Sequence, residues 1–161
     1  MPNPDRSRSV RLALAAIAVA LASPLAAQDL VVYDDQLRNG FQDWSWASDY
    51  DLAFTGQTHT PPNAIRLVPT HWEGLYFHSN AVLDGSDYLE LRLWVKGQSA
   101  GGQQIRLRFW LNGTPRADVD LASYVGGGIS GSEWREAVVP LSAIGLPGQS
   151  FNELVLQANA A

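Results

Sequence analysis

Two neighbouring segments decide the fold, YLELRLWVK (88–96) and QQIRLRFWLN (103–112). In both, apolar and polar residues alternate, which is the period of a β-strand with one face toward a core. The apolar residues are Leu89, Leu91, Leu93 and Val95 in the first segment and Ile105, Leu107, Phe109 and Leu111 in the second. The connection GQSAGG (97–102) is rich in turn residues, so we expect the two strands to pair as a hairpin.

Short segments of the same kind recur along the chain, and no long segment has the period of a helix. Six further strands are expected, at 30–34, 64–68, 74–79, 116–121, 134–140 and 151–158. One short helical turn is expected at 140–145. About eight short strands separated by Gly, Asn, Asp and Pro predict an all-β fold, an antiparallel β-sandwich or jelly roll.

The amino end has the pattern of a secretory signal peptide. Three arginines precede a run of ten apolar residues at 12–21, and small residues follow up to Ala27. A transmembrane helix needs about 20 apolar residues, so cleavage after Ala27 is favoured over an N-terminal anchor. We therefore expect a signal peptide over 1–27, a single domain over 28–161, and a secreted or periplasmic protein.

Charge and cysteine content exclude several classes of function. The formal net charge is −5, and it becomes −7 without residues 1–27, which carry three arginines and one aspartate. An acidic domain is poorly suited to nucleic acid or to an anionic membrane surface, so neither partner is expected. There is no cysteine, which excludes disulfides, thiol chemistry and cysteine-ligated metals.

Five stretches together resemble a known group of domains. They are VYDDQLRNGFQDWSWAS (32–48), WEGLYFHS (72–79), YLELRLWVKG (88–97), GGQQIRLRFWLNG (101–113) and WREAVVPLSAIG (134–145). In this order they resemble the jelly-roll, galactose-binding-like carbohydrate-binding modules of secreted bacterial polysaccharide-degrading proteins. The resemblance implies a non-catalytic domain that binds polysaccharide and acts with a linked or separate glycan-degrading enzyme.

The resemblance also implies two features of the fold. Such domains usually close with a further strand beside the first one. This sequence ends at QANAA (157–161), shortly after the segment FNELVLQ, so we expect a jelly roll with its last strand absent. They often hold a structural calcium near the first and last strands, which makes Asp34 and Asp35 candidate ligands. Calcium needs six to eight oxygen ligands, more than two aspartates supply. The loop containing Asp84 and Asp87 is the alternative, although DGSD is also a common turn.

The polar side of the two central strands supplies the candidate ligand-binding residues. Aromatic rings stack on the CH-rich faces of sugars, while charged groups and amides bond to the hydroxyls. The candidates are Trp94, Trp110, Arg92, Arg108 and Glu90, extended by Tyr76 and His78 on a neighbouring strand. The alternative is a covered second face held by Arg–Glu and Trp–Trp pairs.

Trp44 and Trp46 raise the same question, because residues two apart on an extended chain share a side. Their neighbours Ser45 and Ala47 are small, so one side of the segment is bulky. We expect this pair to serve mainly in core or edge packing, because tryptophan is highly buried on average.

Catalysis is not expected from this sequence. A glycosidase needs two carboxylates about 5–9 Å apart. Only Glu90 and Glu136 fall on the polar side of their strands, and a glutamate among arginines suits a salt bridge better than a general acid. A small glycan-active hydrolase and a structural or protein-interaction domain of the cell envelope are the alternatives to a binding module.

Overall fold

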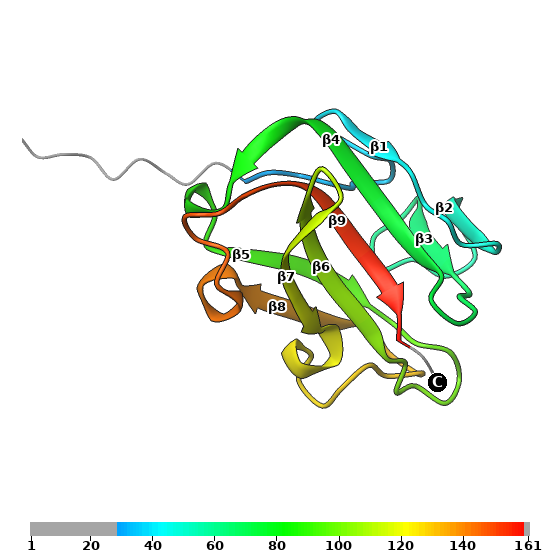
Figure 1. The fold of residues 1–161 in the computed structure, drawn as a ribbon. Helices are drawn as coiled ribbons and strands as arrows, with labels where there is room; N and C mark the ends of the chain where they lie inside the picture. Colours follow the sequence, from blue (N-terminus) through cyan, green and yellow to red (C-terminus); the bar gives the residue numbers. More distant parts are fainter. Residues whose placement is uncertain (1–28, 160–161) are drawn as a thin grey trace, which may run out of the picture.

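The computed structural model describes residues 29–159, so the expected signal peptide at 1–27 lies outside the described residues. Within them the chain is all-β, as the alternation predicts (Figure 1). The strands are β1 (Phe41–Asp43), β2 (Tyr50–Phe54), β3 (Ala64–Leu67), β4 (Gly74–Asp84), β5 (Glu90–Val95), β6 (Ile105–Leu111), β7 (Thr114–Asp120), β8 (Arg135–Pro140) and β9 (Ser150–Ala158). Three short 3₁₀ turns join them, η1 (Gly85–Asp87), η2 (Leu121–Tyr124) and η3 (Leu141–Ile144). No helix in this range is long and apolar enough to cross a membrane.

The strands form an antiparallel sandwich, which confirms the expected fold class. One layer is a five-stranded sheet in the order β1-β4-β9-β6-β7, and the other is the pair β5-β8. The pair β2-β3 lies beside them (Figure 1). Every strand pairing in the described range is antiparallel.

The core lies between the two layers. Its centre comprises Leu75, Phe77, Leu107, Phe109 and Leu154 from the five-stranded sheet, with Ala137, Val139 and Leu141 from the opposite layer. Burial of each large apolar side chain is worth about 1.5–3 kcal/mol, and this core has to provide most of the stability of a chain without disulfides.

The expected hairpin between 88–96 and 103–112 is wrong. β5 pairs with β8, whereas β6 lies between β9 and β7. The connection between β5 and β6 crosses from one layer to the other and is fixed to residues 129–130 by the N–H groups of Gly97 and Gly102. Alternation determines which side of a strand faces the core, but it does not determine the neighbouring strand.

The expected strand at 30–34 is also absent, and only a bridge from Tyr33 to Leu37 forms there. The chain reverses at this point. The N–H of Arg38 donates to the carbonyl of Val32 (2.9 Å), and Asp35 has a left-handed backbone (φ 59°). The other expected strands are confirmed with shifted ends, whereas β1 and β2 were missed. β1 is only three residues long, and β2 (YDLAF) has no clear alternation of apolar and polar residues.

The side of the sandwich at β5 is less completely covered. In residues 29–159, β5 has a partner strand on one edge only. Ala137 and Val139 on β8 are fully buried, while the inward-facing residues of β5 are half-buried.

Candidate functional site

The outer surface of the five-stranded sheet has two rows of side chains that run across three strands. The register places Tyr76, Val155 and Arg108 side by side on β4, β9 and β6. The next row consists of His78, Glu153 and Trp110 on the same strands. These residues alternate with core residues on each strand, so they all face away from the sandwich interior.

Trp44 and Trp46 extend these rows past the end of β1. The N–H of Trp44 donates to the carbonyl of Tyr76 (2.8 Å), and the N–H of Trp46 donates to that of Gly74 (3.2 Å). Because alternate residues share a side, both indoles lie over the same surface as Tyr76. We call the surface formed by Trp44, Trp46, Tyr76, His78 and Trp110 the aromatic face.

Both indoles are held in defined positions. The ring of Trp44 stacks on His78 with centroids 3.8 Å apart and planes at 6°. The ring of Trp46 meets Tyr76 edge-on at 5.8 Å, and its Nε1–H donates to the carbonyl of Trp72 (2.7 Å). The ring of Trp110 also meets the ring of Tyr76 edge-on, with centroids 6.0 Å apart.

The exposure of these indoles excludes the core part of the expectation of core or edge packing, and their contacts fit packing at the edge of the sheet. Trp44 is 49% exposed and Trp46 is 39% exposed. They contact the residues beneath them but leave much of each ring open to solvent. Average burial of tryptophan is a poor guide here, because the pair lies on the outer side of a sheet whose inner side forms the core.

A buried carboxyl group supports the aromatic face from below. Glu153 is 2% exposed and lies 3.3 Å from Nδ1 of His78. It accepts hydrogen bonds from the N–H of Gly113 (2.8 Å) and from the hydroxyl of Tyr76. Burial, followed by this bond to Glu153 and its charge, raises the pKa of Tyr76 well above its usual value of 10. The phenol is therefore strongly held in its neutral form.

Three polar atoms on this side of the sheet have no hydrogen-bond partner among residues 29–159. They are Nε of Arg108, Nε1 of Trp110 and Oε1 of Gln157. Nε of Arg108 lies 3.3 Å from Oδ2 of Asp118, close enough for an ion pair but not aligned for a hydrogen bond. Leaving a buried polar group unpaired costs about 1–3 kcal/mol, so three of them near one surface are a notable concentration.

The seven predicted ligand-binding residues therefore divide between two surfaces. Tyr76, His78, Arg108 and Trp110 are together on the five-stranded sheet, as described above. Trp94, Arg92 and Glu90 are on β5, in the other layer.

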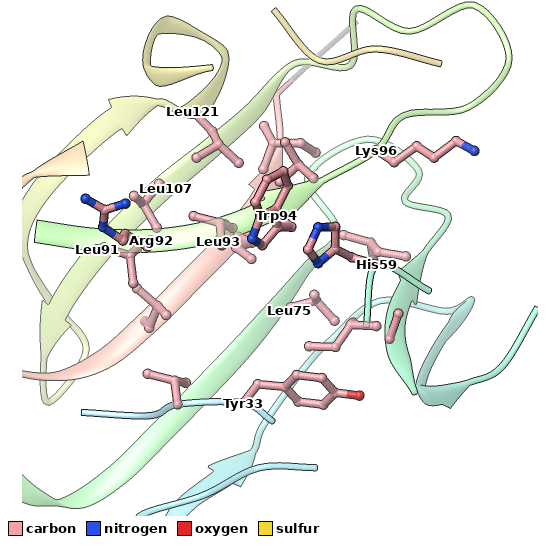
Figure 2. Close-up of a pocket in the computed structure, with 18 of the residues that line it drawn as sticks. Tyr33, His59, Leu75, Leu91, Arg92, Leu93, Trp94, Lys96, Leu107 and Leu121 are labelled. Carbon is pink, nitrogen blue, oxygen red and sulfur yellow. The ribbon is translucent and has the colours of Figure 1, made fainter. Parts of the chain in front are cut away.

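The β5 group makes its own set of contacts. Trp94 stacks on His59, and the two rings lie side by side in Figure 2. Their centroids are 3.9 Å apart and their planes are at 12°. Arg92 bonds to both Glu90 and Glu136, and these bonds raise its pKa. The side chains of Arg92, Glu90 and Glu136 thus satisfy one another.

The candidate calcium ligands make contacts of their own with neighbouring residues. Oδ1 of Asp35 accepts the N–H of Asn63 (2.9 Å), while Asp34 is 3.8 Å from the guanidinium of Arg38. Oδ1 of Asp84 accepts the N–H of Ser86, as in an ordinary turn. In the part of the chain that the structure describes, no three His, Asp or Glu side chains gather closely enough to hold a metal. Calcium binding at Asp34 and Asp35 stays a prediction.

Comparison with known proteins gives one informative similarity. No known protein family matches the chain when it is compared with family models. Over 80 residues, half of this chain, it is 26% identical to a protein from Dictyostelium discoideum described as an endoglucanase. The match spans 11% of that protein's length. This weak similarity supports a carbohydrate-related role at a general level.

Proposed function

We propose that this protein binds polysaccharide without catalysis and that the glycan lies on the aromatic face. The observation that carries the proposal is the pair of half-exposed, rigidly held indoles of Trp44 and Trp46 on an outer sheet surface. Soluble proteins rarely expose contiguous large aromatic groups without a binding role. The similarity to an endoglucanase, an enzyme of carbohydrate chemistry, points in the same direction.

The chemistry of the face suits a sugar polymer. Pyranose rings have CH-rich faces that stack on indoles, and hydroxyls that bond to donors and acceptors. The face supplies both, because the half-exposed indoles offer ring surface, and the exposed Gln42, whose Oε1 accepts from Nε1–H of Trp44 (3.2 Å), offers an amide beside them. The rings are already fixed by His78 and Tyr76, so little side-chain entropy is lost on binding.

A binding role is favoured over hydrolysis by the state of the carboxyl groups. Glu90 and Glu136 are both engaged by Arg92, and the resulting ion pairs hold them as salt-bridge partners. Glu153, the carboxyl group under the aromatic face, is buried and bonded to its neighbours. None of the three is arranged as a free general acid next to an open sugar-binding surface.

The proposal includes a location and a partner. A secreted or periplasmic module of this kind increases the local concentration of a linked or separate glycan-degrading enzyme at its substrate. The alternative is a cell-envelope domain that uses the same face against a partner protein. If this alternative is correct, the domain does not bind isolated glycans.

The test is affinity electrophoresis of residues 28–161 through gels containing cellulose derivatives, xylan, mixed-linkage glucan, pectin or alginate. Trp44→Ala removes a 49% exposed indole from the aromatic face, and Trp94→Ala removes a 46% exposed indole from the opposite layer. The two variants are closely matched in residue type and exposure.

The expected size of the effect follows from area. About half of the roughly 200 Å² of an indole side chain is open on Trp44. At about 25 cal/mol per Å², full coverage by sugar is worth about 2.5 kcal/mol, and half coverage about 1.2 kcal/mol. We expect Trp44→Ala to weaken binding about tenfold and Trp94→Ala to leave it unchanged. Retention of the folded wild type by none of the polymers would contradict the proposal and favour the protein-binding alternative.

A further inference from the structure

A large apolar groove opens into the core on the side of the sandwich away from the aromatic face. Its volume is about 1690 Å³. One wall is β5, with Leu91 and Leu93 directed into the groove, and the opposite wall is the segment that contains Tyr33 (Figure 2). Leu75 and Leu107 of the five-stranded sheet form its floor. The groove thus lies directly against side chains of the buried core.

The uncovered region begins at β5. The inward-facing residues of β8, the strand next to β5, are completely buried, whereas Leu91, Leu93 and Val95 are only half-buried. Leu89, just before β5, is 78% exposed. The change from full to partial burial occurs between β8 and β5, so the uncovered region starts at the free edge of β5.

The free edge of β5 indicates what kind of molecule fits. β5 is six residues long, contains no proline or bulge, and pairs with β8 along one edge. Among residues 29–159 no backbone hydrogen bond reaches its other edge. An exposed strand edge of this kind is a template for another strand. A lipid or small apolar ligand would cover the leucines but leave the backbone groups of this edge unpaired.

We propose that this groove binds an extended strand of another polypeptide, which pairs antiparallel with β5 and places apolar side chains on Leu91, Leu93 and Val95. Strand addition of this type gains affinity from the main chain and specificity from alternate side-chain pockets. Six residues at about 3.3 Å each give a contact about 20 Å long.

The charged residues at the rim of the groove indicate which charges suit the two ends of the partner strand. Lys96 lies at the carboxyl end of β5, while Asp87 and Glu90 lie at its amino end, and all three line the groove. An antiparallel partner starts near Lys96 and finishes near Asp87. An acidic residue at its amino end and a basic residue at its carboxyl end are therefore complementary, although such exposed pairs contribute at most about 1 kcal/mol each.

The test uses a synthetic peptide with the sequence Glu-Thr-Val-Thr-Val-Thr-Val-Thr-Lys. The control peptide has the same composition with its three valines adjacent, so it has no apolar side of matching period. Hydrogen exchange of the β5 amides is measured by NMR with each peptide at about 1 mM, because single short strands bind weakly. A second arm joins the same peptide after Ala161 through a flexible linker of about twelve residues, which raises its effective concentration. Asn159 lines the groove, so a tether at this end starts close to it.

We expect the alternating peptide to slow exchange of the β5 amides that do not bond to β8 by about tenfold or more. Leu93→Glu should abolish this protection, whereas Val138→Glu, on the outward side of the neighbouring strand β8 and outside the lining of the groove, should retain it. If Leu93→Glu fails to fold, Leu91→Thr is the milder substitution for the same purpose. Unchanged exchange in both arms would overturn the proposal, as would a homodimer in which β5 is already protected without peptide.

Discussion

Replacement of Glu153 by leucine is the most direct test of how the aromatic face is supported. Leucine is similar in size and would keep the packing under the row formed by His78, Glu153 and Trp110. It removes every acceptor from that position. The imidazole of His78, the N–H of Gly113 and the hydroxyl of Tyr76 each lose their bond to the carboxyl group.

The cost can be estimated from the burial of the three donors. His78 is 8% exposed and has little access to water. Removing the acceptor of its imidazole therefore costs close to the full value of about 1–3 kcal/mol for an unpaired buried group. Gly113 lies in an exposed turn and Tyr76 is partly exposed, so both recover part of their loss by binding water. The sum is about 3 kcal/mol, which agrees with the range for breaking a buried pair. For a domain of this size the melting temperature falls by about 10 °C.

The assay is urea unfolding followed by tryptophan fluorescence, with Glu153→Gln as the matched control. Glutamine keeps one oxygen acceptor at the same position, so we expect it to cost about half as much as leucine. A loss below about 1 kcal/mol for Glu153→Leu would refute the reasoning. Equal losses for the two variants would show that charge, and not the number of acceptors, supports the face.

Three further outcomes follow from the structure. Tyr76 has a raised pKa in the folded state, so its contribution to stability is complete below pH 10 and is lost as the pH rises above that value. In urea unfolding, the stability of Tyr76→Phe should therefore fall less steeply above pH 10 than that of the wild type. Gly113 has φ +76°, so Gly113→Ala should cost about 1–2 kcal/mol in the same assay, whereas Gly126→Ala, at a position with open space and no positive φ, should cost clearly less. Leu107 is fully buried and Leu89 is 78% exposed, so Leu107→Ala should cost about 2–5 kcal/mol and Leu89→Ala less than about 0.5 kcal/mol in calorimetric or urea unfolding.

The fold class was predictable because alternation determines which side of each strand is buried. Leu107 and Phe109 face the core as their spacing predicts, and Trp110 faces outward. The strand neighbours were not predictable in the same way. The short distance between 88–96 and 103–112 favoured a hairpin, but the hydrogen bonds of Gly97 and Gly102 to residues 129–130 direct the chain across the sandwich. A stronger signal was the Asn112-Gly113 pair, whose left-handed backbone forms the actual hairpin turn between β6 and β7.

The candidate site was only half predictable for the same reason. Trp110, Arg108, Tyr76 and His78 were correctly placed on outward-facing positions, but the partner assumed for Trp110 was Trp94. The structure brings Trp44 and Trp46 to this surface instead, through backbone bonds to Tyr76 and Gly74. These bonds join positions about 30 residues apart in sequence, and alternation within each segment does not indicate them.

The rows on the aromatic face also give it two distinct directions. Trp44 and Trp46 are two residues apart, so a ligand that covers both lies along β4 over about 7 Å. A ligand that covers Trp44 and Trp110 crosses from the β1 side over β4 and β9 to β6, three strand spacings or about 14 Å. The length of the shortest oligosaccharide that binds with full affinity therefore indicates how the sugar chain is oriented on the aromatic face. A sugar chain aligned with the strands needs only half the length of one that crosses them.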